Sequence, residues 1–393
     1  MLKTLTGAAL LFSFAATGAA AQELDALLPE GIPGYGTPFA VVADHKVEAP
    51  QPTGGQWGAF SLVPALAGSG GYDSAPGGAG ASSVFTVAPS LLVTDRVLGF
   101  GAYAAATKAV YPQDGAQNTG GVTLAMGEQV ALPGETVTLA AGYLNAQETG
   151  FALDTVAISR PVAFTLENLR ASDEIVSGPF TLKPEVAVLR YRFPGLAAQD
   201  RTETREGVTA VWSPPGPVQV LLRVAGTQSA DAIPDFSTRT QKVLVGLVDT
   251  ADGLWTFSAL VGVARRQGER APVLEMRLDW MPAELDRVRL EVVREIDDPD
   301  EVGAVAYMLD QAKISVSHEV QTDVTAKFSA QVGEAAYFDS GERETLVGTD
   351  AALSWQLGAH LAVEGAYAFN DRQANYLPAA NEHVVTLGMT WTP

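Results

Sequence analysis

The sequence predicts an all-β fold, a transmembrane antiparallel up-and-down β-barrel of about 18 strands. Three observations support this prediction: an N-terminal export signal, a two-residue alternation of apolar and polar side chains, and a regular exchange of short and long connections. The alternation gives each strand one apolar and one polar face. Short turns at one end with long loops at the other are typical of outer-membrane barrels.

Composition narrows the class of protein. The chain has 393 residues, with 25 basic and 45 acidic side chains, a net charge of −20 and no cysteine. Without cysteine it can form neither a disulfide framework nor a thiolate metal site. No nucleic-acid partner is expected, because neutralising a phosphate backbone needs clustered lysine and arginine.

The first residues predict export from the cytoplasm. Lys3 supplies a positive start, residues 5–16 an apolar core, and residues 19–21 an A-x-A cleavage site. We therefore expect residues 1–21 to be a cleaved signal peptide. An uncleaved helical anchor is the alternative, but the apolar stretch is short for a bilayer span.

Residues 22–55 are rich in proline and glycine and lack sustained periodicity. They are interpreted as a flexible periplasmic tail, which is short for a large plug but can fold into the periplasmic mouth. Residues 56–393 are then the barrel. An exported barrel of this kind is expected in the bacterial outer membrane.

The alternation is clearest in the second half of the chain. In residues 273–281 the even positions are Leu, Met, Leu and Trp, whereas the odd ones include Glu275, Arg277 and Asp279. A strand separates these two sets onto opposite faces, and a helix would scatter them. The same alternation recurs in residues 323–332, 361–369 and 384–391.

Short and long connections alternate along the chain. Short turns are predicted at Pro133–Glu135 and Gln321–Asp323, and longer loops at Asn145–Leu153 and Pro194–Thr204. Ala171–Ser177 is predicted to be an unusually long connection on the short side. We place the short turns in the periplasm and the long loops outside the cell.

Counting the alternating segments gives about 18 strands. An even number returns the chain to the side on which it started, as bacterial single-chain barrels require. About 16 strands is the alternative, because the segments near Thr155 and Val208 alternate poorly. The strands are expected to begin near residues 57, 82, 97, 119, 136, 155, 178, 205, 218, 239, 254, 271, 286, 303, 323, 345, 360 and 383.

A large soluble β-sandwich or propeller is the competing fold, because alternation alone does not show which face meets solvent. The export signal, the missing cysteine and the rhythm of the connections favour the membrane barrel. Aromatic residues near segment ends, such as Trp212, Trp280 and Trp391, favour it too. Tryptophan and tyrosine concentrate at membrane interfaces.

No motif in the chain predicts catalysis. The four histidines are His45, His318, His360 and His383, and no two stand at metal-ligand spacing. Ser317 and His318 are adjacent on one strand and therefore face opposite ways. The acidic run 297–301 is interpreted as a solvated outer loop, because the spacing of a calcium-binding loop is missing. We expect no catalytic residue, no metal, no cofactor and no enzymatic activity.

The polar faces of the strands predict a charged lumen. A basic side chain turned toward lipid near the bilayer midplane would cost about 2–4 kcal/mol, so the charged faces are expected to point inward. Either these charges form a ladder that sets selectivity, or they pair with one another and brace the wall. The candidate lumen-lining residues are Lys183, Glu185, Arg223, Lys242, Glu275, Arg277, Asp279, Arg287, Arg289, Glu291, Lys327 and Glu364.

The first predicted strands also resemble a known family. Trp57–Leu66, followed by Gly71–Ser74, resembles the opening of the β-barrel porin type 2 family, which has a G-x-F-x-L-x-P-x-L segment leading to Tyr-Asp. Val87–Leu91 matches a second strand with the pattern x-P-x-L. The family commonly has Asn shortly after Tyr-Asp, where this chain has Ser74-Ala75. The resemblance implies an outer-membrane barrel, often linked with polysaccharide export, and names no catalytic residue.

Together these observations predict a porin-like channel for passive diffusion or export of a polar solute, with a polysaccharide as one candidate. The expected partners are outer-membrane lipid, the barrel-insertion machinery and the solute, and a homo-oligomer remains open. The alternative is a closed structural barrel that anchors a periplasmic or surface partner without conducting. A hydrolase would need Ser, His and Asp brought within hydrogen-bond reach across strands.

Overall fold

The computed structural model describes nearly all of the predicted barrel and part of the N-terminal region. The described residues are 24, 27–29, 31–35, 55–76, 80–95, 97–151, 153, 160–231, 237–249, 254–297, 306–338 and 340–393. The expected signal peptide, His45 and residues 298–301 of the acidic run lie outside them. In this part of the chain, no helix is long and apolar enough to cross a membrane.

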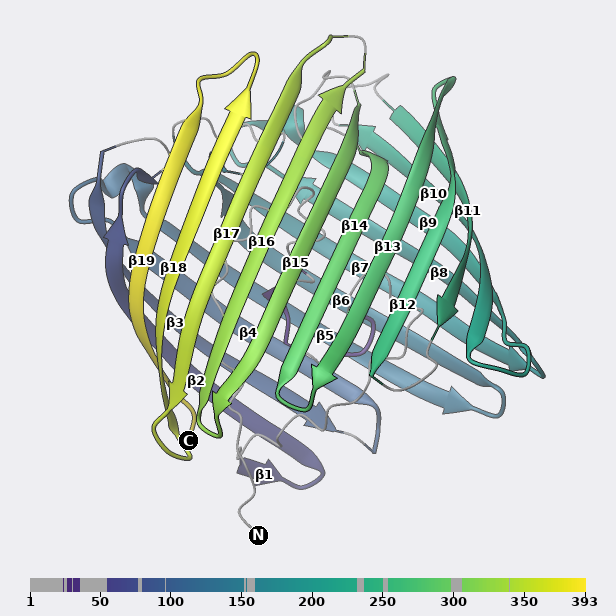
Figure 1. Ribbon diagram of the computed structural model, residues 1–393, viewed down its shortest axis with the longest axis horizontal. Helices are drawn as coiled ribbons and strands as arrows, with labels where there is room; N and C mark the ends of the chain where they lie inside the picture. The colour runs from purple at the N-terminus through teal and green to yellow at the C-terminus, as the bar shows by residue number, and fades with distance from the viewer. Residues whose placement is uncertain are drawn as a thin grey trace.

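One antiparallel sheet contains the strands (Figure 1). A short strand, β1 (Gly55–Trp57), forms a hairpin with the start of β2. Single turns of 3-10 helix, η2 (Gly115–Gln117) and η3 (Ala197–Gln199), lie in two of the loops. The wall consists of β2 (Phe60–Asp73), β3 (Ser82–Asp95), β4 (Phe100–Val110), β5 (Thr119–Leu132), β6 (Glu135–Glu148), β7 (Val162–Ser177), β8 (Phe180–Arg192), β9 (Arg201–Trp212), β10 (Val218–Asp231), β11 (Ser237–Asp249), β12 (Trp255–Arg266), β13 (Glu269–Ala283), β14 (Asp286–Asp297), β15 (Tyr307–Gln321), β16 (Val324–Tyr337), β17 (Arg343–Gln356), β18 (Leu361–Ala374) and β19 (Ala380–Trp391).

The sheet closes on itself. Each strand from β2 to β18 pairs with the next one in the chain, and β19 returns to pair with β2, where Trp391 lies opposite Leu66. Ser74 extends this seam, because its amide donates to the His383 carbonyl (2.9 Å) and its hydroxyl accepts from the His383 amide (2.8 Å). The predicted antiparallel up-and-down barrel of 18 strands is confirmed, and the alternative of about 16 strands is wrong.

The two ends of the barrel differ in their connections, as predicted. At the short-turn end, where the C-terminal strand also ends, β5 and β6 are joined by Pro133 and Gly134 alone (Figure 1). At the long-loop end, residues 149–161 join β6 to β7. One hairpin at the long-loop end is also tight: Gln267 (φ 45°) and Gly268 (φ 104°) join β12 to β13. Two consecutive residues with positive φ are typical of the turn that joins tightly paired strands.

One expected connection is wrong. Ala171–Ser177 is not a loop but the second half of β7, which stays paired with β6 and β8 up to Ser177 opposite Phe180. The polar run at residues 172–174 suggested a loop. In the structure, Glu174 instead forms an ion pair with Lys183 on the neighbouring strand β8, at 2.8 Å. The same strand begins at Val162, later than the expected start near residue 155.

The exposure of the two faces separates a membrane barrel from a soluble one. Leu139, Leu169 and Leu387 are 57%, 61% and 64% exposed, whereas Glu275 and Arg277 are only 4% and 2% exposed. A soluble fold buries its leucines and exposes its charges. Here the apolar face is the outer surface, which suits lipid, and the charged face is the inner face of the wall.

Tryptophan marks one end of the outer surface. All six tryptophans lie on strands within a few residues of the short-turn end: Trp57, Trp212, Trp255, Trp280, Trp355 and Trp391. Four of them, Trp212, Trp280, Trp355 and Trp391, are between 44% and 50% exposed. Indole rings favour the headgroup level of a bilayer, so this belt places the short-turn end at one membrane interface.

The belt makes a testable prediction about depth in the membrane. Intrinsic tryptophan fluorescence of the barrel in lipid vesicles should be quenched strongly by lipids brominated near the headgroup and weakly by lipids brominated at the chain end. The same lipids with unmodified chains serve as the control. Equal quenching at both depths would contradict a belt confined to the interface.

The described N-terminal residues lie inside the barrel (Figure 1). Leu24 and Ile32 are buried, and they pack on the inner face of β4–β8 against side chains such as Leu144 and Tyr103. These residues belong to the expected periplasmic tail, and in the structure they are seated on the wall. Cleavage after residue 21 and the limits of the tail stay predictions.

Candidate functional site

The first group of inner charges joins β10, β11, β13 and β14. Arg223 donates to Glu275 at 2.6 Å, and Lys242 bridges Glu275 at 2.8 Å and Glu295 at 3.2 Å. Two strands separate Arg223 from Glu275 in the sheet, so their contact runs across the concave inner face. The wall is hollowed beside this group, next to Thr227, where Lys242 and Glu295 line the hollow. Side chains of complementary charge thus brace the curvature of the wall.

The second group lies nearer the short-turn end, on β13 and β14. Asp279 accepts from Arg277 and Arg289, both at 2.7 Å, and lies 3.5 Å from Arg287. Glu291 stands 4.0 Å from Arg277. Arg277 is buried, whereas the side chains of Arg287 and Arg289 are 35% and 25% exposed. Two of the three guanidinium groups are therefore accessible from the lumen.

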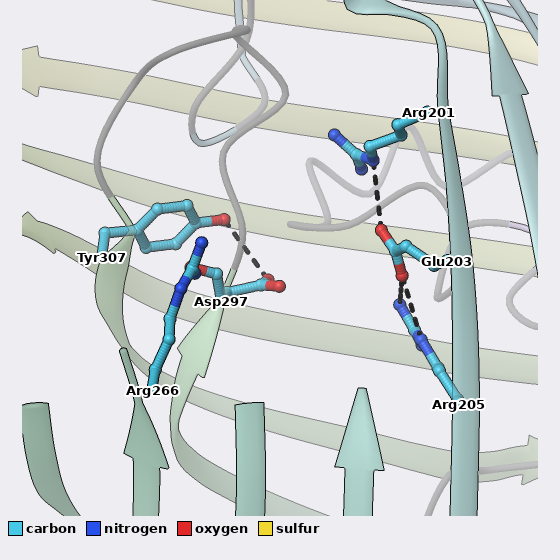
Figure 2. A network of polar contacts seen from close by, with 6 residues as sticks. All are labelled: Arg201, Glu203, Arg205, Arg266, Asp297 and Tyr307. Atoms are coloured by element: carbon cyan, nitrogen blue, oxygen red, sulfur yellow. Dashed lines mark hydrogen bonds and ion pairs between the residues drawn. The ribbon is translucent and has the colours of Figure 1, made fainter. Parts of the chain in front are cut away.

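A third group lies near the long-loop end, and sequence reasoning missed it. On β9, Glu203 accepts from Arg201 at 3.1 Å and from Arg205 at 2.8 Å (Figure 2). The Arg201 guanidinium lies 4.3 Å over the ring of Tyr191. Residues up to Thr204 were expected in the loop Pro194–Thr204, but β9 begins at Arg201. The outer face of β9 carries Thr202, Thr204 and Glu206 here, so no apolar alternation marks this part of the strand.

The other members of the third group come from β12, β14 and β15. Arg266 donates to the backbone carbonyl of Asp297 at 3.3 Å, and the Tyr307 hydroxyl donates to the Asp297 carboxylate at 3.3 Å (Figure 2). Asp297 is also within electrostatic range of Arg205 on β9. Charges from strands far apart in the sequence therefore meet on one part of the inner wall.

These three groups contain eight basic and six acidic side chains. The excess of basic over acidic side chains in these groups contrasts with the net charge of −20 for the whole chain. The basic members are Arg201, Arg205, Arg223, Lys242, Arg266, Arg277, Arg287 and Arg289, and the acidic members are Glu203, Glu275, Asp279, Glu291, Glu295 and Asp297. We call this surface the basic wall.

The structure brings eight of the twelve sequence-predicted lumen residues into the basic wall and leaves four outside it. The four are Lys183, Glu185, Lys327 and Glu364. Lys183 pairs with Glu174 at the short-turn end of β7 and β8. Glu185 on β8, Lys327 on β16 and Glu364 on β18 lie on the inner face, apart from the three groups. A role of any of the twelve in passage stays a proposal.

A loop crosses the lumen from one wall to the other. Phe151 and Leu153, in the connection between β6 and β7, pack against Tyr307, Leu309 and Leu346 on β15 and β17. Eight strands lie between β6 and β15 in either direction around the closed wall, so these contacts lie half a circumference away. The loop therefore narrows the interior at this level.

At its long-loop end, the seam between β2 and β19 brings together the carboxyls of Asp73 on β2 and Glu382 on β19. Burial raises the pKa of the Tyr111 phenol, and the neighbouring carboxyls of Asp73 and Glu382 raise that pKa further. Tyr111 therefore stays protonated at neutral pH and donates to Asp73. This contact ties the residue after β4 to the closing seam.

The histidines are dispersed. His318 pairs with Asp286 at 2.6 Å, His360 contacts the Thr392 carbonyl, and His383 contacts the Tyr367 hydroxyl. Among the described residues, no group of three or more His, Asp or Glu side chains is placed to hold a metal ion.

Comparison with protein families adds the deciding observation: a family described as "Putative beta-barrel porin 2" matches residues 266–392. By its C-terminal third, the chain resembles a porin. The match confirms the resemblance stated from the opening strands, although it covers β13–β19 instead. Porins are channels, so the prediction that the chain is not an enzyme is also confirmed. No curated protein matches the sequence.

Three solved structures similar to this porin-like barrel come from Pseudomonas. The outer membrane protein OpdK of Pseudomonas aeruginosa is 13% identical with a TM-score of 0.48, over 85% of this chain and 99% of that chain. OccK2 (OpdF) of the same organism, in complex with glucuronate, is 12% identical with a TM-score of 0.47, over 85% and 98%. A BenF-like porin from Pseudomonas fluorescens Pf-5 is 11% identical with a TM-score of 0.45, over 86% and 100%.

Proposed function

We propose that this porin-like barrel is an outer-membrane diffusion channel for polar solutes, small anions above all. The basic wall carries the proposal, because eight basic side chains face six acidic ones in a chain of net charge −20. A region of the inner wall with an excess of positive charge raises the local concentration of anions beside it and lowers that of cations.

The wall combines bracing with selectivity. Arg277, whose side chain is 2% exposed, is fixed between Asp279 and Glu291 and braces the strands. The side chains of Arg205 and Arg289 are 37% and 25% exposed, so they reach the lumen water. The two interpretations left open by the sequence therefore apply to different residues.

The expected solute is small. A closed wall of this many strands leaves an aqueous interior, but the loop with Phe151 and Leu153 and the N-terminal residues occupy part of it. A narrowed path suits a small carboxylate or phosphate better than a bulky polysaccharide chain, which is the alternative solute.

Electrical recording tests the proposal. The purified barrel in a planar bilayer under a KCl gradient should show steady openings, with a reversal potential displaced toward that of chloride. Vesicle swelling should be faster with a small organic anion than with an uncharged sugar of equal size. Folded barrels without conductance would overturn the channel and favour the closed docking barrel, whereas uptake of polysaccharide would contradict the narrow path.

A further inference from the structure

The inner wall contains a seat for the N-terminal residues. Gly101 on β4 lies opposite Gly127 on β5, and Gly127 lies opposite Ala140 on β6. A Cβ added to Gly127 would overlap the Pro33 carbonyl oxygen, and one added to Gly101 would lie 2.7 Å from the Gly31 carbonyl oxygen. Glycine inside a strand often marks the close approach of another backbone. Here that backbone is the chain's own, at residues 31–33.

Apolar side chains hold the segment on both sides of this seat. Leu24 is completely buried and packs with Leu144, Phe164 and Leu189. Ile32 is buried against Tyr103 and Ala125. A Cβ added to Gly142, between these two contacts, would lie 2.5 Å from the Tyr35 hydroxyl and 2.9 Å from Leu24 Cδ2. The wall thus offers small residues where the segment approaches and large apolar ones where it anchors.

A polar contact fixes the end of the segment. Arg170 on β7 donates to the Gly34 carbonyl at 3.4 Å, and its guanidinium lies 4.8 Å from the ring centre of Tyr35. Arg170 pairs with Ala140 in the sheet and therefore stands on the inner face. The segment covers a cation that would otherwise face the lumen.

We propose that residues 24, 27–29 and 31–35 form a resident plug that covers the β4–β8 side of the lumen, leaves the basic wall to the solute and shields Arg170. The inference rests on the proposed channel function, and it assigns to the chain's own N-terminal segment the control of pore width. Displacing the plug widens the path and adds a positive charge to it.

The first test displaces the segment without touching the wall. In the double variant Leu24→Asp/Ile32→Asp, two carboxylates replace buried apolar side chains, so the seat should be vacated. We expect larger single-channel conductance. Leu27→Asp is the matched control, since Leu27 is 41% exposed in the same segment, and it should conduct as the unchanged protein does.

The second test does not depend on conductance. The chain has no cysteine, so Ala125→Cys places a single thiol under Ile32. A water-soluble maleimide should label it slowly in the otherwise unchanged barrel and rapidly in the Leu24→Asp/Ile32→Asp background. Ala352→Cys, on the inner face of β17 opposite Lys327, should be labelled at one rate in both backgrounds.

The outcomes separate the two proposals. If folded barrels do not conduct but labelling of Ala125→Cys is faster in the Leu24→Asp/Ile32→Asp background, the proposed channel function is wrong and the seating of the N-terminal segment on the wall is supported. If the barrel conducts and the double variant changes neither conductance nor labelling, the proposal of a plug is wrong and the proposed channel function is supported.

Discussion

Replacing Glu275 by Gln is expected to lower the free energy of unfolding of the barrel by about 3 kcal/mol, because it leaves buried positive charge without its partner. Glu275 accepts from both Arg223 and Lys242, and its own side chain is only 5% exposed. Lys242 retains Glu295 at 3.2 Å, which places the loss at the lower end of the range for a broken buried pair. Equilibrium urea unfolding of the barrel in lipid vesicles, followed by tryptophan fluorescence, measures the change.

Glu206→Gln is the matched control. Glu206 also accepts from an arginine, Arg239, at 3.2 Å, but their side chains are 63% and 59% exposed. An exposed pair contributes about 0–1 kcal/mol, so this variant should unfold almost as the unchanged protein does. Equal losses for the two variants would show that the Glu275 group lies in water and does not brace the wall.

Removing two accessible cations is expected to abolish the preference for anions. In Arg205→Ser/Arg289→Ser, the basic wall retains six basic and six acidic side chains, so its net charge disappears. Each lost residue leaves its carboxylate paired, Glu203 with Arg201 and Asp279 with Arg277. The wall should therefore stay folded while the reversal potential under a KCl gradient moves toward zero.

Arg205→Lys/Arg289→Lys keeps both charges and should preserve the reversal potential. It controls for altered side-chain size and for the loss of guanidinium geometry. If the serine and lysine variants behave alike, the anion preference does not come from the charge of the basic wall.

The sequence predicted the wall well, because lipid imposes a simple rule on it. Wherever a strand lies in the membrane, its outer face must be apolar, and segments such as residues 273–281 and 384–391 show this alternation. The predicted strand bounds were wrong near the ends of the barrel, where the outer face need not be apolar. Residues 201–204 begin β9, yet their outward side chains are polar, and residues 172–174 of β7 lie near the short-turn end.

The candidate site was predictable only as a list of inward charges. Arg277 and Asp279 are two residues apart on one strand, so their shared face follows from the sequence. The pairing of Arg223 with Glu275 does not, since it depends on the curvature of a closed wall across two intervening strands. The packing of Ile32 against Tyr103 and Ala125 is likewise a tertiary contact, and no local sequence pattern predicts it.

The pairing of β19 with β2 has a consequence for the order of assembly. Trp391 and Leu66 come from opposite ends of the barrel sequence, so their contact carries the largest loop-closure cost in the wall. The hairpins can form locally and early, whereas the ring is completed only after the last strand has been synthesised and delivered. Before the ring closes, β2 and β19 each present an unpaired edge, and such edges are prone to aggregation. A chain that lost β19 would keep most of its hairpins and still be unable to finish folding.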